Sequence, residues 1–168
     1  MIYQYAESPL GCLMMAETEA GAGISLLYIG DSEATLMQAA QEAFPDHHWQ
    51  VTTHLSTSLE QICSALQQKQ PQPILPLNVQ GTAFQQQVWQ ALQDIPFGET
   101  VSYSQLAEQL GMPTAVRAVA SACGANEIAL LIPCHRVVRK NGDLSGYRWG
   151  ITRKRQLLDM EQGLRPSN

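Results

Sequence analysis

The chain has no long hydrophobic run, no closely paired cysteines and almost no positive charge in its first half. No apolar stretch approaches the roughly 20 residues that a membrane span needs, and the N-terminus lacks the basic and then apolar segments of a secretory signal. We therefore expect a soluble, cytoplasmic protein with no membrane partner. With 168 residues, the chain holds enough apolar material for one domain or two small ones.

The cysteines and histidines are spaced in ways that argue against a disulfide framework or a metal site. The cysteines are Cys12, Cys63, Cys123 and Cys134, and no two of them form a C-x-x-C pair. The histidines of the first half are His47, His48 and His54, in a polar stretch without the i, i+4 spacing of helical ligands. We expect four free thiols, a solvated loop around these histidines, and no metal or cofactor.

Negative charge is concentrated in the first half of the chain and positive charge in the second. Residues 1–77 hold one basic and eight acidic residues, a net charge of −7, whereas residues 78–168 hold nine basic and seven acidic ones, a net charge of +2. From Pro113 onward the same nine bases meet only four acids. This asymmetry favours a polyanionic partner for the C-terminal part, and an ordinary solvated basic face is the alternative.

The first half of the chain has the pattern of a small sheet covered by helices. Glycines and a proline separate three short apolar or alternating runs that we interpret as strands, at residues 2–5, 12–16 and 24–29. One helix is predicted to begin near Asp31, and a second opens with a capping-box pattern over residues 57–60. Residues 67–81, with three of the nine prolines, form the predicted linker.

We place the domain boundary after residue 77, with an N-terminal α/β subdomain at 1–77 and a C-terminal helix-turn-helix domain at 78–168. Thr82 caps the first predicted helix of the second part, and Pro96 ends it. Residues 102–110, a turn at 111–114 and residues 115–123 outline the helix-turn-helix. The last predicted helix runs from Thr152 to Glu161.

The second helix of this motif is made mostly of alanine and serine, with Arg117 as its single charged residue. Small side chains allow a helix to approach a nucleic-acid groove closely, and one long cation can reach beyond them. Tight packing in a protein core explains the alanines equally well, but it leaves Arg117 unexplained.

The sequence Pro-Cys-His-Arg-Val-Val at 133–138 lies inside an apolar run that starts at Ile128. A thiol next to an imidazole and a guanidinium has the neighbours that lower a thiol pKa, and the thiolate is the nucleophilic form. Cys134 is therefore the first candidate for chemistry. A buried structural cysteine is the alternative on local composition alone.

Residues 132–138 resemble the active-site signature of the O6-alkylguanine-DNA alkyltransferases. The likeness is strong from about residue 81 to residue 161, is greatest with the bacterial Ada-type members, and extends to segments in the same order: 82–89, 101–103, 117–119 and 144–150. With the elements above, it implies an α+β fold. A ribonuclease-H-like sheet with helices would precede a mostly helical, winged-helix-like domain that carries the DNA-binding and active-site residues.

The resemblance implies a DNA repair protein that acts as a monomer on double-stranded DNA. Such a protein enters the minor groove with the second helix of its motif and flips O6-alkylguanine out of the duplex, with O4-alkylthymine as a second candidate lesion. It then transfers the alkyl group irreversibly to its own cysteine. Each molecule acts once, and no cofactor is needed.

The resemblance also assigns roles to single residues. Cys134 is the alkyl acceptor, His135, Asn126 and Glu161 activate and orient it, Tyr103 protonates the departing guanine, and Arg117 fills the space that the flipped base leaves. The other predicted DNA contacts are Thr114, Ala115, Ala118, Ser121 and Arg136. The predicted walls of the substrate pocket are Val137, Tyr147, Arg148 and Trp149.

The chain departs from the family pattern at two places. Glu127 follows Asn126 where many members have proline, which we expect to loosen this loop. Arg148 and Trp149 replace small residues of the vertebrate proteins, so we expect a narrower pocket that excludes bulky alkyl groups. The zinc ligands of the vertebrate N-terminal domain have no counterpart here.

Adjacent residues point in different directions on a strand or a helix, so a direct bond between Cys134 and His135 is awkward. A bridging water is the more natural link, with Glu161 holding the imidazole tautomer. Glu161 falls four residues after the apolar Leu157 on the same helix face, and a carboxylate there needs a partner.

Three other interpretations fit parts of the sequence. A lesion-binding relative without transfer chemistry would lack the acceptor thiol. A cysteine hydrolase would usually place its histidine far from the cysteine in the sequence, and would turn over repeatedly. A role as a helix-turn-helix regulator stays open as an addition to repair.

Overall fold

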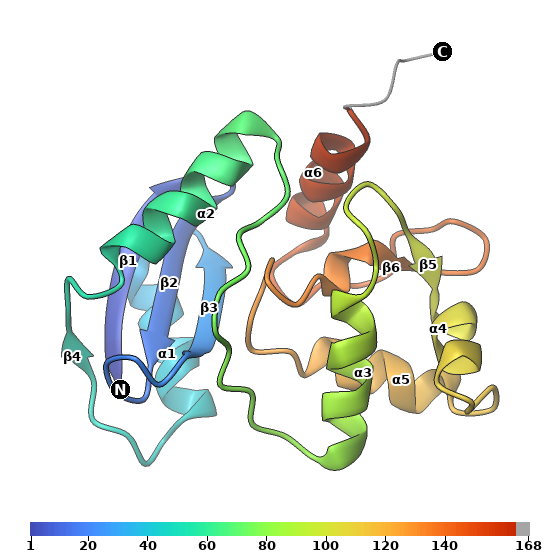
Figure 1. The fold of residues 1–168 in the computed structure, drawn as a ribbon, viewed down its shortest axis with the longest axis horizontal. Coiled ribbons are helices and arrows are strands. Elements are labelled where there is room, and N and C mark those ends of the chain that lie inside the picture. The colour runs from blue at the N-terminus through green and yellow to red at the C-terminus, as the bar shows by residue number, and fades with distance from the viewer. Residues whose placement is uncertain (164–168) are drawn as a thin grey trace. The chain divides into compact units, whose positions relative to one another are not determined.

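The structure is a computed structural model that describes residues 1–163. It contains two compact units, one made of residues 1–79 and 127–131 and the other of residues 80–126 and 132–163. The fold is mixed α+β, with the sheet in the N-terminal unit and six α-helices in the described part of the chain (Figure 1). No helix within residues 1–163 is both long and apolar enough to cross a bilayer.

The first unit is built on a four-stranded sheet in the order β3-β2-β1-β4. The strands are β1 (Ile2–Ser8), β2 (Gly11–Glu17), β3 (Ile24–Gly30) and β4 (Gln50–Val51). β1, β2 and β3 pair antiparallel and confirm the three predicted strands, whereas β4 pairs parallel to β1 and was not predicted. Nearly every residue of β2 and β3 is buried, which requires cover on both faces of the sheet.

Helices α1 (Glu33–Ala43) and α2 (Ser56–Gln68) pack on this sheet, α1 against β2 and β3 and α2 against β1. Ser32 caps α1 by accepting a hydrogen bond from the Thr35 N–H at 3.2 Å. The capping box predicted for residues 57–60 is wrong, because α2 begins at Ser56 with Leu55 in the cap position and no side-chain cap. The buried contacts of Leu59, Ile62 and Leu66 hold this helix in place without a cap.

The segment at residues 127–131 belongs to the first unit, although it follows residues 80–126 of the second unit in the chain. This return to the first unit was not predicted from the sequence. It lies along β3, where the Leu27 N–H donates to the Glu127 carbonyl and the Ala129 N–H donates to the Leu27 carbonyl, both at 2.9 Å. The Tyr28 hydroxyl also bonds to the Glu127 carboxylate. Contrary to our expectation of a loosened loop, Glu127 is fastened at both its backbone and its side chain.

The second unit contains four α-helices and a short parallel pair of strands. The elements are α3 (Ala83–Gln93), β5 (Val101–Ser102), α4 (Tyr103–Gln109), α5 (Val116–Gly124), a 3₁₀ turn η1 (Cys134–Arg136), β6 (Val137–Val138) and α6 (Ile151–Gln162). Thr82 caps α3 as predicted, in a capping box with Gln85. Ser102 caps α4 in the same way with Gln105. The two strands and the 3₁₀ turn were not predicted as such.

The predicted helix-turn-helix is present as α4 and α5, which contact each other. Gly111 lies in the turn between them with a φ of 73°, a conformation that suits glycine. Helix α3 packs against α5, and the Trp89 indole N–H donates to the Ala122 carbonyl at 2.9 Å. The core of this unit therefore holds the motif and the Cys134 segment in one framework.

Candidate active site

Two neighbouring elements bring the Cys134 segment and Tyr103 together. β6 follows η1 directly and pairs in parallel with β5, Val137 opposite Val101 and Val138 opposite Ser102. Tyr103 is the residue that follows β5 and begins α4. The short parallel pairing thus ties the segment that carries Cys134 to the segment that carries Tyr103, and both side chains line one pocket.

Glu161 on α6 is the centre of a buried ionic cluster. Its Oε2 lies 2.6 Å from Nε2 of His135, and its Oε1 lies 2.7 Å from Nε of Arg136. The backbone N–H of Gly98 also donates to Oε1, at 3.3 Å. Burial alone would raise the pKa of Glu161, but the hydrogen bonds and charges of His135 and Arg136 outweigh it and lower this pKa to about 2.

His135 is almost completely buried, at 1% exposure. Burial lowers its pKa below the ordinary 6.5, and the hydrogen bond and charge of Glu161 oppose that shift. With Nε2 facing the carboxylate, the neutral ring carries its proton on Nε2 and leaves Nδ1 as an acceptor. Nδ1 is buried and has no hydrogen-bond partner among residues 1–163.

The prediction that Arg136 contacts DNA is wrong for the structure as described. Its guanidinium is buried, donates to both carboxylate oxygens of Glu161, and donates from Nη1 to the Ile95 carbonyl at 2.7 Å. A cation committed to a buried carboxylate in this way is part of the framework. The sequence showed the charge, but not the partner 25 residues further along the chain.

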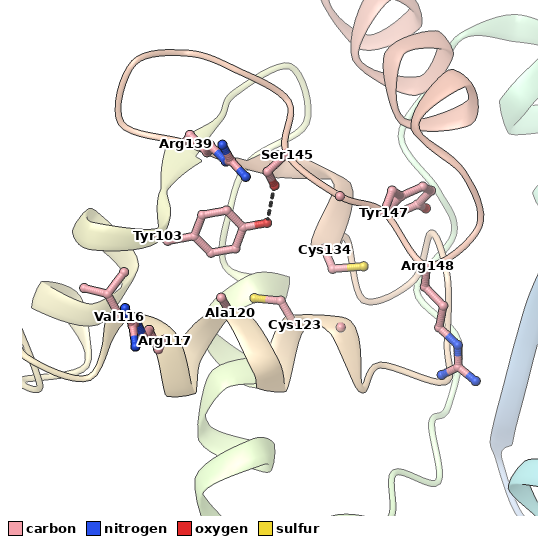
Figure 2. A pocket seen from close by; sticks show the side chains of 12 residues that line it. Tyr103, Val116, Arg117, Ala120, Cys123, Cys134, Arg139, Ser145, Tyr147 and Arg148 are labelled. Atoms are coloured by element: carbon pink, nitrogen blue, oxygen red, sulfur yellow. Dashed lines mark hydrogen bonds between the residues drawn. The ribbon is translucent and has the colours of Figure 1, made fainter.

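Cys134 is buried at 6% exposure and faces the pocket (Figure 2). The side-chain amide of Asn126 donates to its Sγ at 3.4 Å and to the Ile132 carbonyl at 2.9 Å. Burial raises the pKa of the Cys134 thiol, and the Asn126 hydrogen bond and the Lys154 charge oppose this rise. The side chains that favour the thiolate are therefore Asn126, Lys154 and Arg148, and not the sequence neighbours His135 and Arg136.

Lys154 is the functional candidate that sequence reasoning missed. It is completely buried on α6, and its ammonium donates to the Val137 carbonyl at 2.7 Å and to the Gly146 carbonyl at 3.3 Å. Burial lowers its pKa to about 8, and the thiols of Cys134 and Cys123 oppose that shift. A signal was present, because Lys154 lies seven residues before Glu161 and so on the same helix face.

The thiol opens on a pocket of about 530 Å³ (Figure 2). Tyr103 and Ser145 form one part of its wall, their hydroxyl oxygens 2.8 Å apart. Cys123 on α5 lines the pocket as well. The lining, which is drawn from the described residues, includes Arg117, Arg139 and Arg148 but no carboxylate.

The predicted pocket walls are only half present. Tyr147 and Arg148 line the pocket, whereas Val137 and Trp149 are buried and do not. Trp149 packs its ring edge-on against Tyr147, with the centroids 5.3 Å apart. Trp149 is therefore a support behind the wall, since its nearest aromatic neighbour is the residue that faces the cavity.

Helix α5 has one buried and one exposed face, so packing in the core accounts for only part of its small residues. Val119, Ala122 and Cys123 are buried. The exposed residues are Thr114, Arg117, Ala118 and Ser121, and Ala115 is half-buried. These positions recur at three- and four-residue steps, so small side chains and one arginine form a single surface strip.

No cluster of three or more metal-ligating side chains occurs within residues 1–163.

Comparisons with known proteins point to one family. The family model for the 6-O-methylguanine DNA methyltransferase DNA binding domain matches residues 83–163. The chain is 39% identical over 166 residues to the methylated-DNA–protein-cysteine methyltransferase of Mycobacterium bovis, covering 99% of this chain and 95% of that protein. A solved structure of Mycobacterium tuberculosis OGT in complex with DNA superposes with a TM-score of 0.83 at 36% identity, covering 99% of this chain and 96% of the other.

The chain is also 51% identical over 160 residues to the bifunctional transcriptional activator/DNA repair enzyme Ada of Escherichia coli. The match covers 95% of this chain but 45% of that protein. The chain thus spans about half the length of this relative.

The Glu161 cluster predicts a specific effect on stability. Glu161→Gln should leave the buried Arg136 guanidinium without its counter-charge and lower the free energy of unfolding by roughly 3–5 kcal/mol. The pKa of Glu161 is about 2 in the fold against an ordinary 4.5, so its stabilisation is fully present above about pH 4.5 and lost as the pH falls toward 2.

Urea unfolding of the parent and the variant between about pH 7 and about pH 3 measures both effects. Asp159→Asn, an exposed change on the same helix, is the control. If the parent does not lose stability faster than Glu161→Gln on acidification, Glu161 is not the carboxylate that holds this cluster together.

Proposed function

Because the chain belongs to the O6-alkylguanine-DNA alkyltransferase family, we propose that it repairs DNA by moving the alkyl group of O6-alkylguanine onto Cys134. The observation that carries this proposal is a buried thiol at a pocket whose wall also holds a phenol and whose lining, within residues 1–163, has cations and no carboxylate. The reaction needs a nucleophilic thiol, a group that gives a proton to the departing guanine, and a pocket that admits a nucleobase of polyanionic DNA.

Transfer requires attack by the Cys134 sulfur on the alkyl carbon. A carbon–sulfur bond forms as the carbon–oxygen bond breaks, and the product is a thioether that water does not hydrolyse. Each molecule therefore acts once. A module that only binds the lesion would have no use for a thiol at this position, so the presence of Cys134 favours transfer over binding alone.

Activation of the thiol falls to Asn126, His135 and Lys154. Nδ1 of neutral His135 is available as the proton acceptor because Nε2 is bonded to Glu161, and we propose that a bridging water carries the proton from the thiol. Asn126 and the Lys154 ammonium stabilise the thiolate that results. The carbonyls of Val137 and Gly146 accept hydrogen bonds from the same ammonium. Lys154 therefore also links β6 to Gly146, which lines the pocket.

Tyr103 is the proposed acid. Its hydroxyl shares a hydrogen bond with Ser145 at the pocket wall, and a proton delivered from there would neutralise the departing guanine at its oxygen or at the conjugated ring nitrogen. Burial raises the pKa of Tyr103, and the Ser145 hydrogen bond opposes that rise. The phenol is thus protonated before transfer.

We propose that the protein binds duplex DNA as a monomer and that the exposed strip of α5 enters the minor groove. Thr114, Ala115, Ala118 and Ser121 would then lie against the backbone, and Arg117 would occupy the place of the flipped guanine. In this view, residues 78–168 form a winged-helix-like DNA-binding and catalytic domain. Residues 1–77 form a ribonuclease-H-like α/β subdomain, and the protein works in the cytoplasm. O4-alkylthymine is a second candidate lesion for the same pocket.

The proposal predicts stoichiometric methylation of one cysteine. Duplex DNA with O6-methylguanine, added in excess, should raise the intact mass of the protein by one methyl group. Peptide mapping should place that group on Cys134 and not on Cys123, the other thiol of the pocket. Cys134→Ser should take up none, and repeated turnover or methylation of Cys123 would contradict the mechanism.

Arg117 provides a second test, because it concerns base flipping alone. Arg117→Ala should slow methyl transfer from duplex DNA far more than transfer from free O6-methylguanine, since extruding a base costs a few kcal/mol and the free base avoids that cost. Single-turnover rates on both substrates measure the effect. Arg155→Ala, which removes an exposed cation from α6, is the matched control. Equal losses on the two substrates would assign Arg117 to the fold or the thiol.

The pocket wall predicts poor acceptance of bulky groups. O6-benzylguanine should react slowly with the parent, and Trp149→Gly should speed it by allowing Tyr147 to move back, with methyl transfer changed much less. Removing a buried tryptophan costs roughly 3–5 kcal/mol, so Trp149→Phe controls for loss of packing. A parent that takes benzyl as readily as methyl would show that Tyr147 and Trp149 do not limit the pocket.

A further inference from the structure

We propose that Arg139 is a positioning residue for Tyr103, its guanidinium stabilising the phenolate that forms as Tyr103 gives its proton to the departing guanine. This inference rests on the proposed function and extends it to a residue that neither the sequence motifs nor the thiol network includes. Three independent features place Arg139 in that role: strand register, the turn that follows it, and the charges around the phenol.

The register of β5 and β6 brings the two residues together. The strands run parallel, with Val101 opposite Val137 and Ser102 opposite Val138. Tyr103 directly follows β5 and Arg139 directly follows β6, so the parallel pairing brings both residues to the same end of the two strands. Both side chains line the same pocket. Figure 2 shows the guanidinium of Arg139 and the Ser145 side chain on the same side of the Tyr103 ring.

A tight turn fixes the backbone of Arg139. Its N–H donates to the Asp143 carbonyl and its carbonyl accepts from the Gly142 N–H, both at 2.8 Å. Gly142 closes the turn with a φ of 89°, which favours glycine. The chain then runs back to Ser145, the hydrogen-bond partner of Tyr103. One short loop therefore delivers both the hydroxyl and the cation that face the phenol.

The guanidinium is not committed elsewhere. The Arg139 side chain is exposed and forms no ion pair or hydrogen bond within residues 1–163, in contrast to the buried and fully bonded Arg136. The charges around Tyr103 come from three elements. Burial raises the phenol pKa most, the Ser145 hydrogen bond lowers it, Cys123 on α5 and Cys134 on η1 raise it, and Arg139 lowers it.

The step balances without any further reactant. The thiol gives its proton to the water and His135, its sulfur takes the alkyl carbon, and the electron pair of the broken bond stays on the guanine. Tyr103 then supplies the proton that makes this guanine neutral. The phenolate left behind regains a proton from the one released by the thiol. A cation next to the phenol is of most use during the interval in which the phenolate exists.

The test is a double-mutant cycle with two substrates. Single-turnover methyl transfer is measured with duplex O6-methylguanine DNA and with free O6-methylguanine, for the parent, Arg139→Met, Tyr103→Phe and the double variant. Arg139→Lys keeps the charge. Lys140→Met removes the exposed cation next in the chain, which does not line the pocket, and is the matched control for net charge.

We expect Arg139→Met to slow transfer about threefold to fivefold on both substrates, the size typical of an exposed charge pair. Arg139→Lys should retain most of the rate, Lys140→Met should match the parent, and Arg139→Met should have no further effect once Tyr103 is Phe. A loss confined to duplex DNA would assign Arg139 to a phosphate contact instead. The same loss in the Tyr103→Phe background would also overturn the proposal.

A readout without transfer separates this inference from the proposed function. In ¹³C-tyrosine NMR titrations, with Tyr103→Phe used to identify the signal, Arg139→Met should raise the pKa of Tyr103. An unchanged pKa would overturn the inference even if Cys134 is methylated. A parent that takes up no methyl would overturn the proposed function and leave the titration result to stand alone.

Discussion

The active site depends on one buried carboxylate. Glu161 is held on α6, and its two oxygens bind the imidazole of His135, the guanidinium of Arg136 and the Gly98 N–H. Because Arg136 also donates to the Ile95 carbonyl, the loop after α3, the turn η1 and helix α6 meet at a single ionic point. A buried charge with this many partners tolerates little displacement. The position of the 3₁₀ turn, and with it the position of Cys134, follows from that constraint.

The groups that favour the Cys134 thiolate are not its neighbours in the sequence. Cys134 was identified from its neighbours in sequence, a histidine and an arginine, on the ground that they lower a thiol pKa. In the fold both neighbours face Glu161, and His135 is neutral because burial lowers its pKa. The side chains that favour the thiolate are Asn126, from eight residues before it, Lys154, from the last helix, and Arg148, from the pocket wall.

The local patterns of the sequence predicted much of the fold, because they rest on short-range physics. The cap at Thr82, the strand alternation in the first half and the turn of the helix-turn-helix each involve residues a few positions apart. What escaped prediction needs distant pairing. The return of residues 127–131 along β3 is one case, and the parallel pair β5 and β6, only two residues long in each strand, is another. The burial of Lys154 and Arg136 is a third, since it depends on carbonyls and a carboxylate brought in by other elements.

The same distinction separates the candidate site residues. The exposed strip of α5 could be predicted, since helical spacing decides which residues share a face. The pocket wall could not, because Tyr147 faces the cavity while Trp149, two residues later, packs behind it. Arg139 was missed for a further reason, which is that its relation to Tyr103 exists only through the register of two short strands.

We propose that Glu161 fixes His135 as a neutral imidazole with its proton on Nε2, leaving Nδ1 to accept the thiol proton. ¹⁵N NMR of the histidine side chains at neutral pH tests this directly, with Glu161→Gln as the comparison that removes the carboxylate. We expect a neutral His135 ring protonated at Nε2 in the parent and a change in that pattern in Glu161→Gln. A His135 ring protonated at Nδ1, or at both nitrogens, in the parent would contradict it.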